Sequence, residues 1–328
     1  LCTGGKLTPG FKYVLCLALV SAYGMLVSFS TQGYKLISIS FSTLFVLVTF
    51  RFTYLVFKGD LLKQRVNTIA YKLIRGGLFM LCLSALGPFA LGPLAALALQ
   101  HTAYYQDAIY FYLHCQMNGF MLLAALGLLA SAASFKPLTD HAGLWLDLFI
   151  FSTIPLYFIF TLWAQVGTWL WILAYISSGL NLVSWLALCF NFRNNLRNIN
   201  FLEKMALIAL TFKCIFQLLV CIPAIGEWTF LNRNLVIGYI HLLTLGIIMP
   251  LIISQFIRTG LIKSSKRITT VNILYIVLVV TYLCLLFIQP LLALLSIMIP
   301  CYQFLLFLLC ISFLPVGVLL FFKMKSSS

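Results

Sequence analysis

Acidic residues are nearly absent from this sequence. Asp and Glu together number 6 among 328 residues, and charged residues of both signs make up 8%, against about 25% in soluble domains. Hydrophobic residues make up 63%, and the mean hydropathy is +1.08. So little charge cannot cover the surface of a soluble domain, which excludes that class of protein. We expect an all-α, polytopic transmembrane helical bundle instead.

Motifs of soluble enzymes are also missing. The chain has no H-E-x-x-H helix, no P-loop, no nucleophile elbow and no C-x-x-C pair. Most of its ten cysteines lie inside apolar runs, where we interpret them as small lipid-compatible residues rather than metal ligands. The sequence therefore assigns no catalytic residue.

Apolar runs recur along the whole chain. A helix that rises about 1.5 Å per residue needs about 20 apolar residues to cross a hydrocarbon core of about 30 Å. We therefore predict a single transmembrane domain over residues 1–328. Its ten spans are expected at 11–30, 36–57, 76–99, 108–130, 143–163, 168–190, 204–222, 235–257, 271–290 and 301–322.

Lysine and arginine are distributed unevenly between the loops. With ten spans, 17 of the 21 positive residues fall on one side, and the other side has only Lys35 and Arg233. Because Lys and Arg are retained in the cytoplasm, both termini are predicted to be cytoplasmic. The net charge of +15 then follows from topology and from contact with anionic headgroups. The expected partner is the lipid bilayer, and nucleic acid is not expected.

The third predicted span contains two Gly-Pro pairs. Gly87-Pro88 and Gly92-Pro93 stand five residues apart in "SALGPFALGPLAAL". A proline removes a backbone donor and clashes with the preceding turn, so we expect a kink or an opening between Gly87 and Pro93. Two interpretations stay open: a kink that improves packing, which we favour, or exposed carbonyls that meet a ligand.

Two histidines lie inside predicted spans. His114 and His241 are each about 9 to 10 Å from the outer end of their span, which places them at the same depth. Asn118 is expected on the same helix face as His114, whereas Gln116 points elsewhere. These four residues are candidates for an interhelical hydrogen-bond network or for a heme or metal site, in which His114 and His241 would be the metal ligands.

Few charged residues fall within the spans. Arg51 and Asp147 lie near cytoplasmic ends, from which their side chains can reach the interface. Lys213 lies near mid-membrane and should face the interior of the bundle, where it can line a water path. Lys213 and Asp147 are therefore the candidate residues of a polar pathway.

Three stretches carry a family resemblance: "GMLVSFSTQGYKLISISFSTLFV" from Gly24, "SALGPFALGPL" with "YQDAIYFYLHCQMNGF", and "LVIGYIHLLTLGIIMPLI" from Leu235. They resemble a group of inner-membrane proteins of Bacteroidetes related in pattern to NnrS-type proteins and, more remotely, to subunit I of heme-copper oxidases. The resemblance implies a bacterial inner-membrane protein that binds heme or copper near the periplasmic face through His114 and His241.

This chain departs from that family pattern at several positions. An early histidine-rich stretch has no counterpart here, so we expect the chain to start at about the family's third helix and to lack two N-terminal helices. Phe45 stands where relatives often have histidine, and the relatives' His-Phe-Gln-Tyr-Asn-Gly-Trp reads His114-Cys-Gln-Met-Asn-Gly-Phe120. A complete heme-copper oxidase core takes about six histidine ligands, and this chain has 4 histidines. It cannot be a complete terminal oxidase.

Two other functions remain open. A small-molecule or ion transporter or channel would use the broken third helix and Lys213, and matching interrupted helices in both halves would support it. The sequence has Gly-Pro breaks in one half only. A non-catalytic subunit of a membrane complex would instead pack its lipid-facing sides against other membrane subunits.

Overall fold

A computed structural model describes residues 8–33, 35–58, 66–132, 139–164 and 166–322. The regular structure in these ranges is helical, which confirms the predicted all-α bundle. By their internal contacts, the helices form two compact units, Leu1–Gly127 (unit 1) and Leu128–Ser328 (unit 2). That both units act as a single transmembrane domain stays a prediction.

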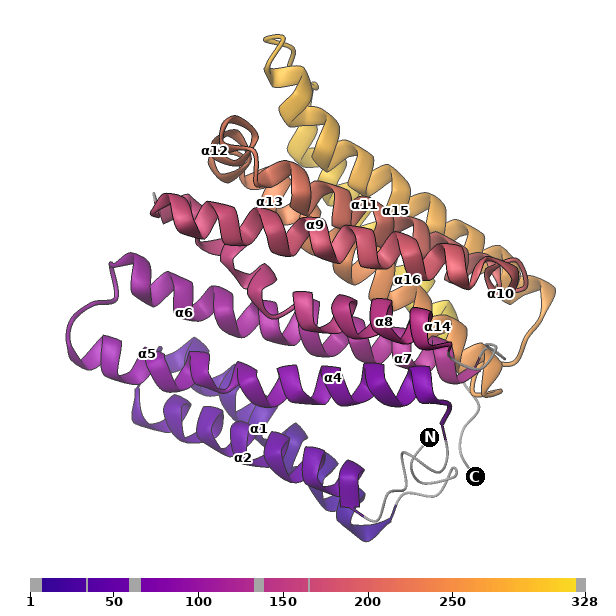
Figure 1. The fold of residues 1–328 in the computed structure, drawn as a ribbon, viewed down its shortest axis with the longest axis horizontal. Helices are drawn as coiled ribbons and strands as arrows, with labels where there is room; N and C mark the ends of the chain where they lie inside the picture. Colours follow the sequence, from indigo (N-terminus) through magenta and orange to yellow (C-terminus); the bar gives the residue numbers. More distant parts are fainter. Residues whose placement is uncertain (1–7, 34, 59–65, 133–138, 165, 323–328) are drawn as a thin grey trace. The chain divides into compact units, whose positions relative to one another are not determined.

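Unit 1 begins with a helical hairpin of α1 (Pro9–Gln32) and α2 (Leu36–Phe57), drawn in indigo and purple in Figure 1. The chain continues through α4 (Thr68–Ser84), α5 (Leu86–Ala96) and α6 (Ala103–His114) into a π-helix, η2 (Cys115–Met121). The next helix, α7 (Leu122–Ala132), begins in unit 1 and ends in unit 2. The α4 helix packs on η2, and α5 packs on α6.

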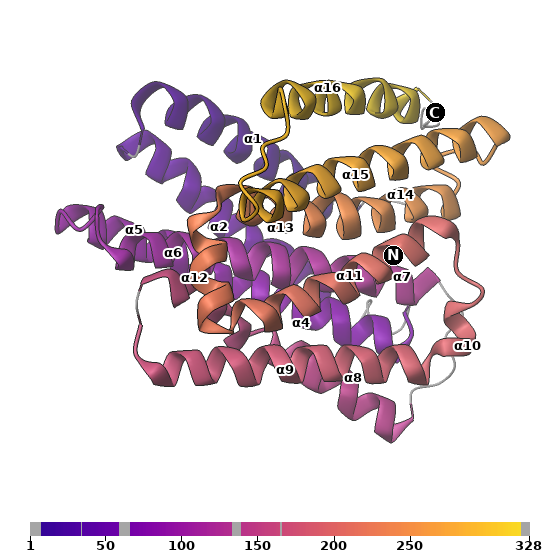
Figure 2. The same ribbon diagram turned by 90° about the horizontal axis from the view of Figure 1, so that it is seen from above.

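Unit 2 begins with α8 (Asp140–Ser152), a 3-10 helix η3 (Pro155–Ala164) and α9 (Thr168–Asn191). Its remaining helices are α10 (Arg193–Leu196), α11 (Phe201–Val220), α12 (Pro223–Leu231), α13 (Arg233–His241), the π-helix η4 (Leu242–Ile248), α14 (Met249–Arg258), α15 (Lys266–Ala293) and α16 (Tyr302–Phe321). In Figure 2, α16 lies beside α15 at the edge of unit 2, with only 6% of its span buried.

Membrane-spanning length and composition are met along nine of the ten expected segments, and the segment at 204–222 differs. Nine described helices qualify by themselves; α11 and α12 qualify only as a pair bent by 108°, which gives the expected ten if the pair is counted as one span. The third span begins at Thr68 rather than at residue 76. Lys72 and Arg75 lower the hydropathy before residue 76, so the apolar pattern placed the start of the span too late. The helix begins at Thr68 because Asn67 caps it by accepting a hydrogen bond from the Ala70 amide. The cytoplasmic position of the termini stays a prediction.

The third span is interrupted before its Gly-Pro pairs rather than between them. The α4 helix ends at Ser84 and α5 starts at Leu86, so the break is at Ala85. The cause is Pro88, which has no amide hydrogen for the Ser84 carbonyl four residues earlier. Pro93, by contrast, lies inside continuous α5.

The two glycines of these pairs differ in their surroundings. A Cβ on Gly87 would lie 2.7 Å from Tyr112 Cβ and 2.8 Å from the Ala108 carbonyl oxygen, so glycine lets α5 approach α6 closely. A Cβ on Gly92 would meet nothing within 4 Å. The packing interpretation therefore fits Gly87, and nothing in the structure explains Gly92.

Candidate functional site

A histidine followed at once by a π-helix occurs in both units. His114 is the last residue of α6 before η2, and His241 is the last residue of α13 before η4. The two sequences share the pattern Tyr-x-His-x-x-x-x-Gly, from Tyr112 to Gly119 and from Tyr239 to Gly246. We call each of these segments, with its π-helix, a His-π element. A π-turn adds a residue to the helix and is often found at functional sites.

The His-π element of unit 1 is buried against α4. His114 and Asn118 are 2% and 3% exposed, whereas Gln116 is half-buried and interacts with the Tyr112 hydroxyl. A Cβ on Gly119 would lie 2.6 Å from Met80 Cβ on α4. Glycine is therefore needed at this position because a larger residue would push η2 away from α4.

The His-π element of unit 2 holds its imidazole in one tautomer. His241 Nδ1 lies 2.8 Å from the Ile237 carbonyl oxygen, which can only accept, so Nδ1 carries the hydrogen. Nε2 is left as the acceptor, with the ring edge-on to Tyr282 at a centroid distance of 5.3 Å. The ring lines a cavity of about 440 Å³ that is also bordered by Tyr275 and Cys310.

The backbone of η4 is satisfied from a neighbouring helix. The Tyr275 hydroxyl on α15 donates to the Leu245 carbonyl at 2.7 Å. A Cβ on Gly246 would lie 3.4 Å from Ala209 Cβ on α11. In each unit, the π-helix therefore packs on the long helix that precedes it in the chain, α4 or α11.

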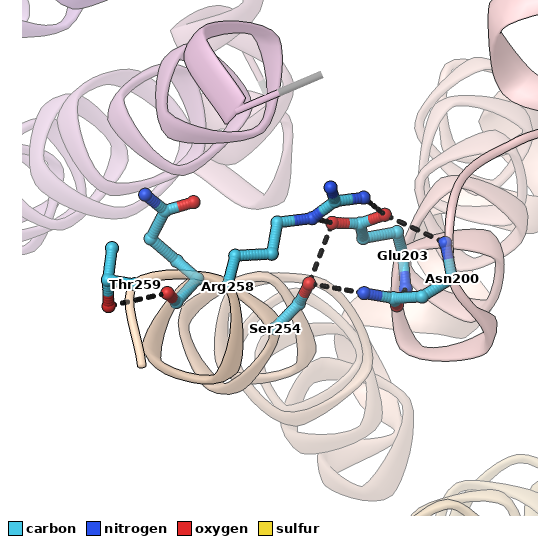
Figure 3. Close-up of polar contacts among 6 residues, drawn as sticks. Asn200, Glu203, Ser254, Arg258 and Thr259 are labelled. Atoms are coloured by element: carbon cyan, nitrogen blue, oxygen red, sulfur yellow. Dashed lines mark hydrogen bonds and ion pairs between the residues drawn. The ribbon is translucent and has the colours of Figure 1, made fainter. Parts of the chain in front are cut away.

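Buried polar residues follow one face of α11. The first is Glu203, only 1% exposed, whose carboxylate accepts from Arg258 Nε at 2.7 Å, Arg258 Nη2 at 2.7 Å and the Ser254 hydroxyl at 2.6 Å (Figure 3). The backbone amide of Asn200 donates to the same carboxylate at 2.9 Å. The side chain of Asn200 caps α11 by accepting from the backbone amide of Glu203. We call these four residues the α11–α14 clamp, because they tie the start of α11 to the end of α14.

Lys213 is the second buried polar residue on α11, at 1% exposed. It lies ten residues beyond Glu203, or about 15 Å along the axis. Glu203 is therefore too distant to neutralise the ammonium, and its carboxylate is already held by Arg258. An ionisable group inside a span is costly, and its presence there is by default a sign of function.

Polar groups of α8 and α9 contact Cys214, the residue that follows Lys213. Cys214 Sγ donates to Asn181 Oδ1 at 3.5 Å, and Asn181 Nδ2 donates to the Ser152 hydroxyl at 2.9 Å. Asp147, the other expected member of the pathway, lies half-buried on α8. That Lys213 and Asp147 line one pathway stays a prediction.

The third polar residue of this face is Gln217, near the bend between α11 and α12. Its Nε2 donates to the Tyr239 hydroxyl at 2.8 Å. The bend depends on Pro223 at the start of α12 and on Gly226, where a Cβ would lie 2.5 Å from the Val220 carbonyl oxygen. This second interruption was not predicted from the sequence, although Pro223, directly after the predicted span 204–222, is a sequence signal that could have indicated it.

A metal centre with three protein ligands does not form among the described residues. No group of three or more His, Cys, Asp or Glu side chains is close enough to hold an ion, and the nine cysteines described are free. This does not fit a copper site, whereas a heme iron takes only one or two axial ligands. His114 and His241 belong to different units, so their common depth stays a prediction.

No protein-family model, curated protein or solved structure matches this chain. The candidate sites are therefore defined by the geometry of each unit alone: a His-π element in unit 1, and a His-π element and a buried polar face on α11 in unit 2.

Proposed function

We propose that the protein is a membrane transporter or channel for a small anion. The supporting observation is that each unit carries the same series of elements: a long helix, an interruption, a short helix, and a His-π element that packs back on the long helix. In unit 1 this series is α4, α5, α6 and η2, and in unit 2 it is α11, α12, α13 and η4. Interrupted helices in corresponding positions of two halves are typical of transporters.

The buried charge of unit 2 indicates the sign of the transported ion. A protonated Lys213 would supply a positive charge near the middle of a predicted span, where the side chain is buried, and cationic side chains select for anions in membrane pores. Asn181 and Ser152 supply polar groups beside the following residue, Cys214. An anion bound at Lys213 would neutralise the ammonium, which Glu203 is too distant to do.

Electrical recordings on proteoliposomes test this proposal. Jumps of chloride, nitrate or bicarbonate across a solid-supported membrane should give currents that Lys213→Met abolishes and Lys213→Arg partly retains. Lys204→Met is the matched control, because Lys204 is an exposed residue of the same helix. Currents equal to those of empty liposomes for all three anions, or equal currents for Lys213→Met and the wild type, would disprove the proposal.

Heme binding is a second candidate function, favoured by His241. Its Nδ1 donates to a backbone carbonyl, as the second nitrogen of metal-bound histidine usually does, and Nε2 is left to bind iron. The resemblance to NnrS-type and oxidase proteins of the bacterial inner membrane belongs to this proposal. An absorption spectrum of detergent-purified protein tests it, and a missing Soret band would exclude it.

Association with other membrane subunits is a third possibility. The weakly buried α16 offers a surface for it. Migration on a native gel as a monomer of 36.9 kDa plus detergent would count against it.

A further inference from the structure

A cavity of about 570 Å³ lies beside the bend between α11 and α12 in unit 2. Its walls come from η3, α11, α12, α13 and α15. The cavity exists because α12 turns away from the axis of α11 instead of continuing it. Its volume falls in the range of about 300–1,000 Å³ typical of small-molecule sites.

Aromatic rings form much of the wall. Phe160 and Tyr239 face each other at a centroid distance of 5.9 Å, and Phe216 and Phe287 at 5.2 Å. Trp228 and Phe230 on α12 add two more rings. None of the described residues that line the cavity carries a charge, so a charged ligand would lose its hydration there without compensation.

Gln217 provides an unmatched hydrogen-bond acceptor in this wall. The residue is 2% exposed, and its Nε2 is engaged with Tyr239. Its Oε1 is buried and has no hydrogen-bond partner among the described residues. A buried carbonyl without a donor is unfavourable, and such groups in folded proteins usually have a partner.

The rim of the cavity shows where a ligand would come from. Leu219, Leu291 and Leu294 line the cavity and are exposed, at 39%, 52% and 63%. In a membrane these apolar side chains contact hydrocarbon rather than water. The route to Gln217 therefore starts in the lipid.

We infer that this cavity binds a neutral, membrane-dissolved aromatic or aliphatic alcohol, whose hydroxyl donates to Gln217 Oε1. The apolar body of the ligand contacts the aromatic wall, and its single donor satisfies the amide oxygen. This inference does not depend on anion transport, because neither Lys213 nor His241 is among the residues that line the cavity.

Photolabelling with a matched pair of probes tests the inference. The full chain in phosphatidylcholine nanodiscs is irradiated with 4-hydroxybenzophenone or 4-methoxybenzophenone, and labelled peptides are mapped by mass spectrometry. The two probes have the same apolar body, but only the first has a donor. We expect the hydroxyl probe to label the cavity-lining peptides about fivefold more, which is the effect of one neutral hydrogen bond.

Three variants identify the acceptor and the cavity. Gln217→Leu should remove the preference for the hydroxyl probe, whereas Gln255→Leu on α14, outside the cavity, should keep it. Ala224→Phe should fill the cavity and prevent labelling by both probes, which keeps the test valid if Gln217→Leu misfolds. Equal labelling by the two probes, stronger labelling by the methoxy probe, or no cavity peptide labelled at all would overturn the inference.

Discussion

The α11–α14 clamp predicts an asymmetric response to removing its two charges. Arg258→Met leaves the Glu203 carboxylate buried at 2% side-chain exposure with no cation, although Ser254 and Asn200 still donate to it. Glu203→Gln leaves the Arg258 guanidinium, whose side chain is 31% exposed and can turn to water. Arg258→Met should therefore be the more damaging change.

The magnitudes follow from the contacts that each change removes. Removing one partner of a buried pair costs about 3–5 kcal/mol, and the exposure of Arg258 reduces this value. We expect Arg258→Met to lower the free energy of unfolding by about 3 kcal/mol. Glu203→Gln keeps one oxygen acceptor, which can accept from either the Asn200 backbone amide or the Ser254 hydroxyl, so it should cost about 1–2 kcal/mol.

Unfolding in mixed micelles with increasing sodium dodecyl sulfate measures both values. The double variant should cost less than the sum of the single variants, by about 1–2 kcal/mol of coupling energy. Arg267→Met, at an exposed position, is the control and should change stability by less than about 0.5 kcal/mol. A strictly additive cycle, or a cost for Arg258→Met equal to that of the control, would show that the clamp does not stabilise the fold.

Three further predictions test topology and the His-π elements. Reporter fusions after Asp60 and after Gln100 should lie on opposite sides of the membrane, and the same location for both would refute the ten-span order. Gly119→Val should lower stability by about 1–3 kcal/mol, because its side chain would overlap Met80. Gly92→Ala has open space around the new methyl group and should be neutral or slightly stabilising. A circular-dichroism melt that ranks the two variants the other way would contradict the packing. His114→Leu should lower the melting temperature in detergent without changing the visible spectrum. The reason is that His114 is 2% exposed and a leucine cannot replace the polar contacts of the imidazole. Loss of an absorption band would show instead that His114 binds a chromophore.

Composition and hydropathy predicted the helical bundle and its spans, because the length of an apolar run is set by membrane thickness. Span 36–57 matches α2 at both ends. Lys213 could also be predicted to face the interior, because a charge in lipid is costly, and it is 1% exposed.

Local backbone irregularities were harder to predict. The breaks at Ala85 and at Cys221-Ile222 arise from prolines two or three residues further along, so the position of a proline does not directly give the position of the break. The π-helices have no strong compositional signal. The two segments share only the Tyr-x-His-x-x-x-x-Gly pattern in sequence. The structure shows what the pattern indicates, because a π-helix follows the histidine in both segments.

The cavity and the clamp depend on tertiary contacts that no sequence pattern contains. Glu203 and Arg258 are 55 residues apart, and the pairing requires α11 to lie beside α14. Gln217 lies within the predicted span 204–222, and its unmatched oxygen follows only from the place of Tyr239 and the bend after Val220.

The π-helix η4 also determines the direction in which the side chains of the following helix, α14, point. Each residue in an α-helix advances the side-chain direction by about 100°, so the extra residue of a π-turn rotates the rest of the helix by about that angle. Ser254 and Arg258 lie downstream of η4 and meet Glu203 only in the rotated phase. Deleting one residue between Leu242 and Ile248 would therefore turn both side chains away from α11, even though every residue of the clamp would still be present.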